Sequence, residues 1–387
     1  MKIIQICAAY KPAFVYGGPT MSVAKLSEEL TKAGHDVTVL ATTANGKAEL
    51  DVPIGQETLV DGVKVYYFKR ITKDHTHFSP SLFWFLHQLI TKEKKKGRKS
   101  ELVVHIHAWW NLVSIFSCLI AKLNGVKVVL SPRGMLTSYS LTNRNSKVKN
   151  IIHFLLGKKL LKYCYIHATS DKEQRDVRQT CSVNGVTVIP NFVEFPKLSA
   201  VSNQETSISN NEIYRLIFLS RIEQKKGLEL LFDALATLDI PWQLSIAGSG
   251  EPNYVLTLQE LAAKLKINDK IKWLGHIKND HKFNLIANQD LLILTSYNEN
   301  FANVVIESLA MGTPVLVSEE VGLARYVQEN NLGWVSSLTK EHLAQVITRS
   351  FSETENRDRI RANSPKKIML DFDNINLANQ YVTIYRN

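Results

Sequence analysis

The sequence lacks long apolar runs, closely spaced cysteines and the glycine fingerprint of a nicotinamide site. The longest apolar run, residues 112–121, contains two serines and falls short of the 18 residues of a membrane span, so it predicts a core helix. The four cysteines are scattered without C-x-x-C spacing, which predicts reduced core thiols in a cytoplasmic protein. G-x-G-x-x-G is absent, and the first residues show no cleavable signal pattern. These absences argue against a membrane-spanning protein, a disulfide scaffold and a nicotinamide-dependent enzyme.

The composition is that of a globular protein long enough for two domains. Of the 387 residues, 45% are hydrophobic and 21% are charged, so a sizeable core can be buried. Most single domains are shorter than this chain. A polar segment rich in Ser and Asn, residues 196–211, is a natural boundary between two α/β patterns. The sequence therefore predicts two α/β domains.

Positive charge is concentrated in the first half of the chain. Residues 1–197 carry 28 Lys and Arg against 14 Asp and Glu, whereas residues 198–387 carry 19 against 22. Nucleic acid is disfavoured as a partner, because zinc-ligand spacing, an RNP-like run and an arginine-rich recognition helix are missing. A helix over residues 145–165, rich in Lys and Leu, favours an anionic membrane surface, although an ordinary amphipathic helix explains it equally. The lysine-rich residues 92–99 predict an exposed loop.

Residues 291–318, LLILTSYNENFANVVIESLAMGTPVLVS, form the most organised stretch of the sequence. An apolar run at residues 291–295 predicts a buried strand, and a polar loop follows it. A helix is predicted to start near Asn303 and to stop at Gly312-Thr313-Pro314, where the next strand begins. This strand–helix–strand pattern places its first loop at the carboxyl end of a parallel sheet, where such folds bind ligands.

Two carboxylates, Glu299 and Glu307, mark this loop and its helix. Over eight helical steps they would lie about 12 Å apart, too far to act as an acid/base pair on one glycosidic bond. The spacing suits a ligand with a hydroxyl-rich group at each end and an anion in the middle. The main-chain amides at the helix start are suited to the anion. A nucleoside diphosphate sugar has this shape, but two solvated surface glutamates fit the same spacing.

Glu299-x7-Glu307 within NENFANVVIESLAMGTPVLVS resembles the signature of retaining glycosyltransferases of family 4. The resemblance implies the GT-B fold: two Rossmann-like, doubly wound parallel-sheet domains that face a central cleft, with a C-terminal helix crossing back onto the first. We expect residues 1–192, with about 368–387, to form the acceptor domain. Residues 193–367 are expected to form the nucleotide-sugar donor domain.

The resemblance also implies which residues bind the donor. Arg221 and Lys226 follow a strand and precede Gly227. Two cations so placed can clamp a diphosphate, and they match the family's pair for that task. Glu299 is implied to hold sugar hydroxyls, and Glu307 to hold the ribose diol. Further donor contacts are expected from the loop after Glu299 and from two later strand ends, at Asn300, Phe301, Ala302, Asn303, Gly248, His276 and Ile277.

The first domain contributes a second set of candidates. Gly17-Gly18 follow a predicted strand and permit close approach of a ligand, although a plain turn explains them as well. In the resembling family this loop lies near the donor diphosphate. Arg133, after another strand, meets a phosphate or the acceptor, or caps its loop. Trp109 offers a stacking platform for an acceptor sugar or packs in the core.

His105 and His107 alternate along a predicted strand. We expect them to point to opposite faces, one buried and one at the strand end, which argues against a shared metal. The family carries a histidine at the second position, directed at the donor sugar, and His107 matches it.

Asp371–x–Asp373 has the letters of a metal-binding DxD motif but lies in a predicted C-terminal helix far from the other motifs. We interpret it as surface charge, and we expect neither a required metal nor another cofactor.

These observations predict a retaining, metal-independent hexosyltransferase. It is expected to use UDP- or GDP-sugar and a glycan or polyprenyl-diphosphate-linked acceptor in bacterial surface polysaccharide biosynthesis: lipopolysaccharide, exopolysaccharide or capsule. We expect it in the cytoplasm, either free or peripheral on the inner face of the cytoplasmic membrane. The alternatives are a sugar-nucleotide epimerase or hydrolase of the same fold, and a non-catalytic basic module that binds a membrane.

Overall fold

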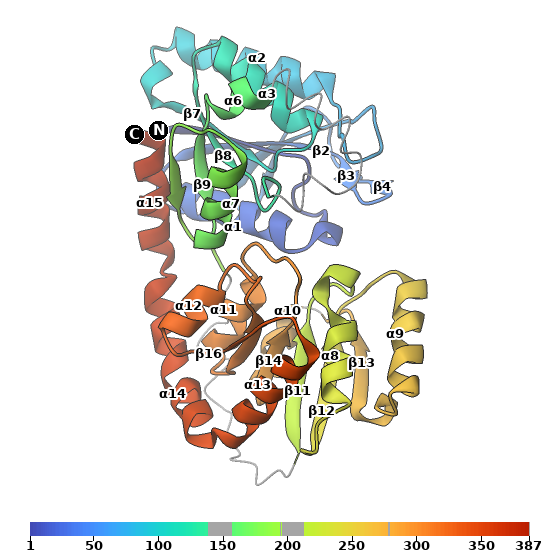
Figure 1. The fold of residues 1–387 in the computed structure, drawn as a ribbon. Helices are drawn as coiled ribbons and strands as arrows, with labels where there is room; N and C mark the ends of the chain where they lie inside the picture. Colours follow the sequence, from blue (N-terminus) through green and yellow to red (C-terminus); the bar gives the residue numbers. More distant parts are fainter. Residues whose placement is uncertain (138–156, 194, 196–212, 278, 387) are drawn as a thin grey trace. The chain divides into compact units, whose positions relative to one another are not determined.

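The computed structural model describes residues 1–137, 157–193, 195, 213–277 and 279–386. The chain forms two compact units, shown in Figure 1. Unit 1 comprises Met1–Phe192 and Phe372–Asn387, and unit 2 comprises Val193–Asp371. Most of the basic helix predicted at residues 145–165 lies outside the described residues. Within the described part of the chain, no helix combines the length and the apolar character that crossing a membrane requires.

Unit 1 is built on an eight-stranded sheet in the order β10-β9-β8-β7-β1-β2-β6-β5. Only β5 runs antiparallel to its neighbour. The strands are β1 (Lys2–Cys7), β2 (Asp36–Thr42), β5 (Glu57–Val60), β6 (Val63–Phe68), β7 (Leu102–His107), β8 (Lys127–Ser131), β9 (Tyr165–Ala168) and β10 (Val186–Val188), with β3 (Ala44–Asn45) and β4 (Ala48–Glu49) in a separate ribbon.

Two apolar cores cover the two faces of this sheet. One core joins alternate residues of the central strands to α2 (Pro80–Lys95), α3 (Leu112–Leu123), α6 (Lys158–Leu161) and α7 (Asp171–Thr180). The other joins the intervening strand residues to α1 (Gly18–Lys32) and α15 (Asn374–Arg386). Every residue of β1 and β7 is buried, because both faces of these central strands are covered. Most of their side chains are therefore apolar, and the polar ones form hydrogen bonds inside the protein. The C-terminal helix thus belongs to the core of unit 1.

Unit 2 is a fully parallel six-stranded sheet in the order β13-β12-β11-β14-β15-β16. Its strands are β11 (Tyr214–Leu219), β12 (Trp242–Ala247), β13 (Ile271–Gly275), β14 (Leu291–Leu294), β15 (Val315–Ser318) and β16 (Gly333–Ser336). Its helices are α8 (Leu228–Leu235), α9 (Pro252–Lys264), α10 (Asn279–Ala287), α11 (Asn303–Ala310), α12 (Ala324–Glu329), α13 (Lys340–Ser352) and α14 (Thr354–Asp371).

Each sheet has a point where the order of its strands reverses. In unit 1 the chain runs outward through β2 and returns to add β7 on the other side of β1. In unit 2 it runs outward through β12 and β13 and returns to add β14 beside β11. Loops diverge at the carboxyl ends of the two strands that flank such a point, which leaves a crevice for ligands in doubly wound sheets. Both units are therefore Rossmann-like, as predicted.

Some local predictions are confirmed and others are wrong. The predicted βαβ unit is present as β14, α11 and β15. The basic run at residues 92–99 is only partly a loop, because α2 continues through Lys95 and Glu93 is buried beside Lys96. The two aspartates of the DxD letters lie at a helix junction: Asp371 ends α14, and Asp373 accepts a hydrogen bond from the Asn376 amide at the start of α15.

Candidate functional site

Two loops meet at the strand reversal of unit 2, one after β11 and one after β14. The hydroxyl of Thr295 donates to the carbonyl of Gly227 at 2.9 Å, and the amide of Tyr297 donates to the carbonyl of Lys225 at 2.9 Å. Gly227 has φ +67°, and a Cβ there would overlap the Thr295 carbonyl oxygen. This explains why glycine follows the two lysines: the loops pack backbone against backbone.

This packing brings Lys226 and Glu299 together. The Lys226 ammonium contacts the Glu299 carboxylate, and the Lys226 side chain is almost fully buried. The main chain holds Glu299 on its other side, because its amide donates to Glu320 and its carbonyl accepts from Gly322. A buried ammonium beside a carboxylate keeps both charges paired, and lysine has three donors, so it can contact a second anion without leaving the first.

Arg221 and Glu307 have other partners. Arg221 is the second residue after β11, and its side chain is half exposed and pairs with Glu223 at 2.7 Å. Glu307, on α11, is nearly buried and pairs with Lys282 of α10 at 2.8 Å. The structure therefore brings only Lys226 and Glu299 into direct contact, and the other two predicted residues lie on the same two βα segments.

The residues after Glu299 lead directly into α11, which begins at Asn303 as predicted. Glu299 itself lies outside the helix, so the fully helical spacing considered from the sequence does not apply. Ala302 precedes the helix in the left-handed region, at φ 69° and ψ 74°. Phe301 is buried, so its side chain packs in the protein, and a ligand contact would use its main chain.

The two other predicted donor loops occupy the far side of the same sheet edge. Gly248 has φ +147°, and a Cβ there would overlap the carbonyl oxygen of Ser220. Its amide donates to the Gly275 carbonyl at 2.8 Å. Strand packing therefore accounts for this glycine without a ligand. His276 is exposed and Ile277 is partly exposed, directly after β13.

In unit 1, Gly17 and Gly18 begin α1 after the loop that follows β1. Gly17 has φ +64°, which favours glycine, whereas Gly18 is the first helical residue and has an ordinary backbone. A Cβ added to either would meet no protein atom within 4 Å. Space beside this backbone is therefore open, as a ligand contact requires.

The prediction for His105 and His107 is wrong in geometry. Residues two apart in a strand share a face. The centroids of the two imidazole rings lie 4.2 Å apart, and both side chains are buried. His107 Nε2 lies 2.6 Å from Gln5 Oε1, and Arg133 donates to His107 Nδ1 from 3.3 Å. Because arginine can only donate, Nδ1 accepts and Nε2 carries the proton. Both ring nitrogens are engaged, so a sugar contact would require one of these bonds to break.

His105 belongs to a directional chain of hydrogen bonds behind this pair. His167 Nε2 donates to the Ile189 carbonyl at 2.8 Å, so its Nδ1 accepts from the Ser131 hydroxyl at 2.6 Å. Ser131 in turn accepts from His105 Nε2 at 2.7 Å, and His105 Nδ1 accepts from Tyr385 at 2.7 Å. Every member is neutral: burial holds the pKa of His105 and His107 well below the usual range and lowers that of His167 to about 3.

Trp109 and Arg133 differ in what they offer a ligand. Trp109 is fully buried in the core of unit 1, so the stacking platform is not formed and core packing is the correct alternative. Arg133 is partly exposed at the carboxyl end of β8. Besides His107 it contacts the side-chain oxygen of Asn191 at 3.2 Å.

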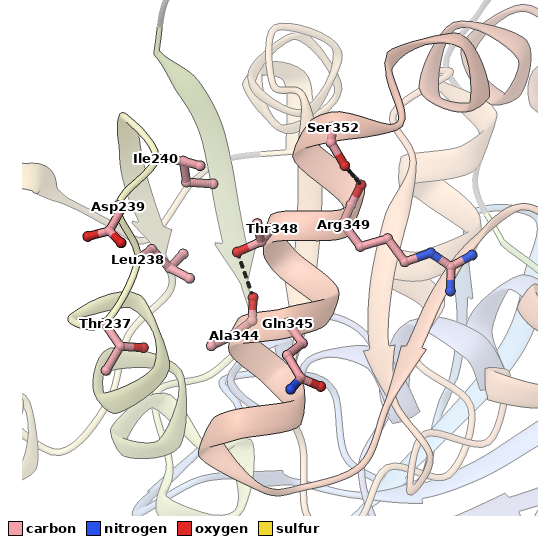
Figure 2. A pocket seen from close by; sticks show the side chains of 9 residues that line it. All are labelled: Thr237, Leu238, Asp239, Ile240, Ala344, Gln345, Thr348, Arg349 and Ser352. Carbon is pink, nitrogen blue, oxygen red and sulfur yellow. Dashed lines mark hydrogen bonds between the residues drawn. The ribbon is translucent and has the colours of Figure 1, made fainter.

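One surface cavity, with a volume of about 510 Å³, lies elsewhere in unit 2 (Figure 2). It is lined by Thr237, Leu238, Asp239, Ile240, Ala344, Gln345, Thr348, Arg349 and Ser352. Residues 237–240 directly precede β12, so this cavity lies at the amino ends of the strands. It is therefore at the sheet edge opposite the loops described above. Among the described residues, no group of three or more His, Cys, Asp or Glu side chains could hold a metal ion.

The structure is that of a two-domain α/β protein with two doubly wound sheets and a cation–carboxylate pair at the strand reversal of the second. Residues 16–195 match the family described as Glycosyltransferase Family 4, and residues 202–367 match the one described as Glycosyl transferases group 1. The two matches span nearly the whole chain. The chain belongs to the glycosyltransferases of this family 4 type.

Relatives over the full length agree with this assignment. An uncharacterized glycosyltransferase of Methanocaldococcus jannaschii is 26% identical over 406 residues, covering 100% of this chain and 98% of the relative. Sucrose-phosphate synthase from Thermosynechococcus elongatus has a TM-score of 0.74 at 19% identity, covering 100% and 98% of the two chains. HepE of Anabaena, in complex with UDP-glucose, has a TM-score of 0.71 at 18% identity, covering 99% of each. These structures show that the fold is GT-B.

Proposed function

We propose that this glycosyltransferase moves a hexosyl group from a UDP- or GDP-sugar to a glycan or polyprenyl-diphosphate-linked glycan, with retention of anomeric configuration and without a metal. The proposed setting is surface polysaccharide biosynthesis at the cytoplasmic face of a membrane. The observation that carries the proposal is the contact of the buried Lys226 ammonium with the partly exposed Glu299 carboxylate at the strand reversal of unit 2. The UDP-glucose complex of the similarly folded HepE makes UDP the first donor to test.

The chemistry assigned to these residues follows from the charges that develop during transfer. Breaking the anomeric C–O bond places negative charge on the leaving diphosphate and positive charge on the sugar ring. Lys226 and Arg221 stabilise the diphosphate, and fixed cations that require no reorganisation are effective in this role. Glu299 accepts hydrogen bonds from sugar hydroxyls, and Glu307 from the ribose diol. The acceptor attacks from the face that the diphosphate leaves, and a donor phosphate oxygen takes its proton.

The donor class can be tested by ligand-induced stabilisation. UDP or GDP at a hundredfold excess over Kd should stabilise the protein by about 2.7 kcal/mol, a rise in Tm of roughly 5–10 °C. NAD should produce no rise. Arg221→Ala and Glu307→Ala should each abolish most of this rise in Tm. Because the Arg221 side chain is half exposed, Arg221→Ala should also leave the Tm of the ligand-free protein nearly unchanged. A shift with NAD alone, or with none of the three, would contradict the proposal.

A second test concerns the glycine loop of unit 1. Gly18→Ala should leave the free energy of unfolding within about 0.5 kcal/mol of wild type, because its backbone is ordinary and the new methyl group meets no protein atom. The methyl group would occupy space proposed for the ligand, so the transfer rate should fall by at least about tenfold. Rates and denaturant curves measured together check this. Unchanged transfer in a stable Gly18→Ala protein would remove the loop from the site.

A further inference from the structure

Within the described part of unit 1, the Arg133 guanidinium forms no ion pair. Its guanidinium donates to His107 Nδ1 and to Asn191 Oδ1, and both partners are uncharged. The nearby carboxylate of Glu173 is engaged by main-chain amides of Gly134 and Thr169 instead. Desolvation is the main cause that lowers the pKa of Arg133, with Tyr381 and Glu173 acting in the other direction. A cation that is partly desolvated and partly exposed in this way is stabilised by an anion that can reach it from solvent.

The backbone presents this guanidinium in an uncommon way. Arg133 has φ +53°, a left-handed conformation that costs a residue with a Cβ, and Gly134 follows at φ +76°. Such strain persists where surrounding contacts fix it, and it is concentrated at ligand sites. Arg133 follows the carboxyl end of β8, at the same sheet edge as the Gly17-Gly18 loop after β1. Its position is therefore that of a ligand-binding residue.

One partner of Arg133 is held by a further hydrogen bond, and the other lies next to a hydrogen-bonded segment of unit 1. His107 is held by Gln5 on its far nitrogen. Asn191 lies two residues after Ile189, whose carbonyl is the end point of the chain that runs from Tyr385 through the two histidines and Ser131. The fork of donors is thus oriented before any ligand arrives, which lowers the entropy cost of binding.

We propose that Arg133, oriented by His107 and Asn191, forms a phosphate-binding site in unit 1, built from other residues than the Lys226–Glu299 pair of unit 2. Arginine presents a planar fork of donors that matches two oxygens of a phosphate group. The phosphate belongs either to the diphosphate of the donor or to a phosphorylated acceptor. The assignment of the phosphate to a donor or to an acceptor rests on the proposed function. The predicted affinity of Arg133 for a phosphate group does not.

The site can be tested by calorimetric titration of the whole chain with inorganic pyrophosphate. Lys226→Met serves as the background, because it weakens the unit 2 site. In this background Arg133→Gln should lower the remaining pyrophosphate affinity at least tenfold. Arg98→Gln is the matched control: it removes the same charge from the same unit, but Arg98 precedes β7 at the opposite sheet edge, and the affinity should not change.

The source of the phosphate follows from UDP titrations of Arg133→Gln in the wild-type background. Weaker UDP binding assigns the site to the donor diphosphate, whereas unchanged UDP binding together with lost pyrophosphate binding assigns it to the acceptor. If the glutamine variant melts early, Arg133→Lys keeps the charge without the fork and should retain an intermediate affinity. Pyrophosphate binding that is insensitive to both variants overturns the site. Absence of UDP and GDP binding to the wild type would instead contradict the proposed function.

Discussion

Replacement of Lys226 by methionine is expected to lower the rate of sugar transfer by about 10²- to 10³-fold, the cost typical of losing one fixed group that stabilises a developing negative charge. Methionine keeps the length and the apolar contacts of the side chain, so the loss concerns the ammonium. The ammonium lies beside Glu299 within an almost fully buried side chain, where solvent cannot replace it. Steady-state kinetics with a UDP-sugar donor measure the effect, which should appear in kcat as well as in kcat/KM.

The neighbouring lysine provides the control for this experiment. Lys225 is partly exposed and its ammonium pairs with Glu223 at 3.3 Å, while its main-chain carbonyl accepts from the Tyr297 amide of the β14 loop. Lys225→Met removes the same charge one residue away and should change the rate less than about threefold. Equal losses in the two variants would mean that general positive charge in the loop matters and that the buried ammonium has no special role.

Removal of Lys226 also leaves the Glu299 carboxylate without its cation. A carboxylate that loses its partner in a nearly enclosed site destabilises the protein, so part of a rate loss could reflect misfolding. The double variant Lys226→Met/Glu299→Gln removes both charges and should recover stability. It should not recover transfer, because the diphosphate still lacks its cation. Denaturant curves and kinetics on the three proteins separate these two effects.

The fold and the central loop could be predicted because local patterns determine them. Neighbouring residues are enough to predict β14 from its apolar run, the turn at Gly312 and the following strand β15. The same stretch of sequence also predicts that the helix starts at Asn303. The proximity of Lys226 and Glu299 could be expected only because both follow strands of one parallel sheet. Their contact depends on β11 and β14 being neighbours, which the resemblance to a known family implied.

Side-chain partners distant in sequence could not be predicted. Lys282 pairs with Glu307 from a separate helix 25 residues earlier, and no local pattern marks it. For Trp109 the sequence left a stacking platform and core packing as alternatives, and only its tertiary contacts decide for the core. The error for His105 and His107 was different, because strand geometry alone requires that both lie on one face. Correct use of that rule would have revealed the buried histidine pair.

Acid should unfold unit 1 steeply because this histidine group is neutral and enclosed. In the unfolded chain each histidine titrates near pH 6.5, whereas in the folded unit the pKa of His105 and His107 is well below that value and the pKa of His167 is about 3. Below pH 6.5 the unfolded state therefore binds more protons, so stability falls as the pH falls. Each histidine contributes about 1.4 kcal/mol per pH unit, and three contribute about 4 kcal/mol per unit until their folded pKa values are reached.

A loss of this size over two pH units is comparable to the whole stability of a typical domain, about 5–15 kcal/mol, so unit 1 should unfold near pH 4–5. His167→Gln tests the cause, because the glutamine amide can still accept from Ser131 and donate to Ile189 but cannot be protonated in this range. Between pH 7.5 and 5.5, urea unfolding should show a total loss of unfolding free energy that is smaller by about 1.4 kcal/mol in the variant, because the unfolded histidine takes up close to one proton over this range. His75→Gln, at an exposed position, is the control and should keep the wild-type slope. Equal slopes for His167→Gln and wild type would show that carboxylate protonation, and not the buried histidines, sets the acid sensitivity.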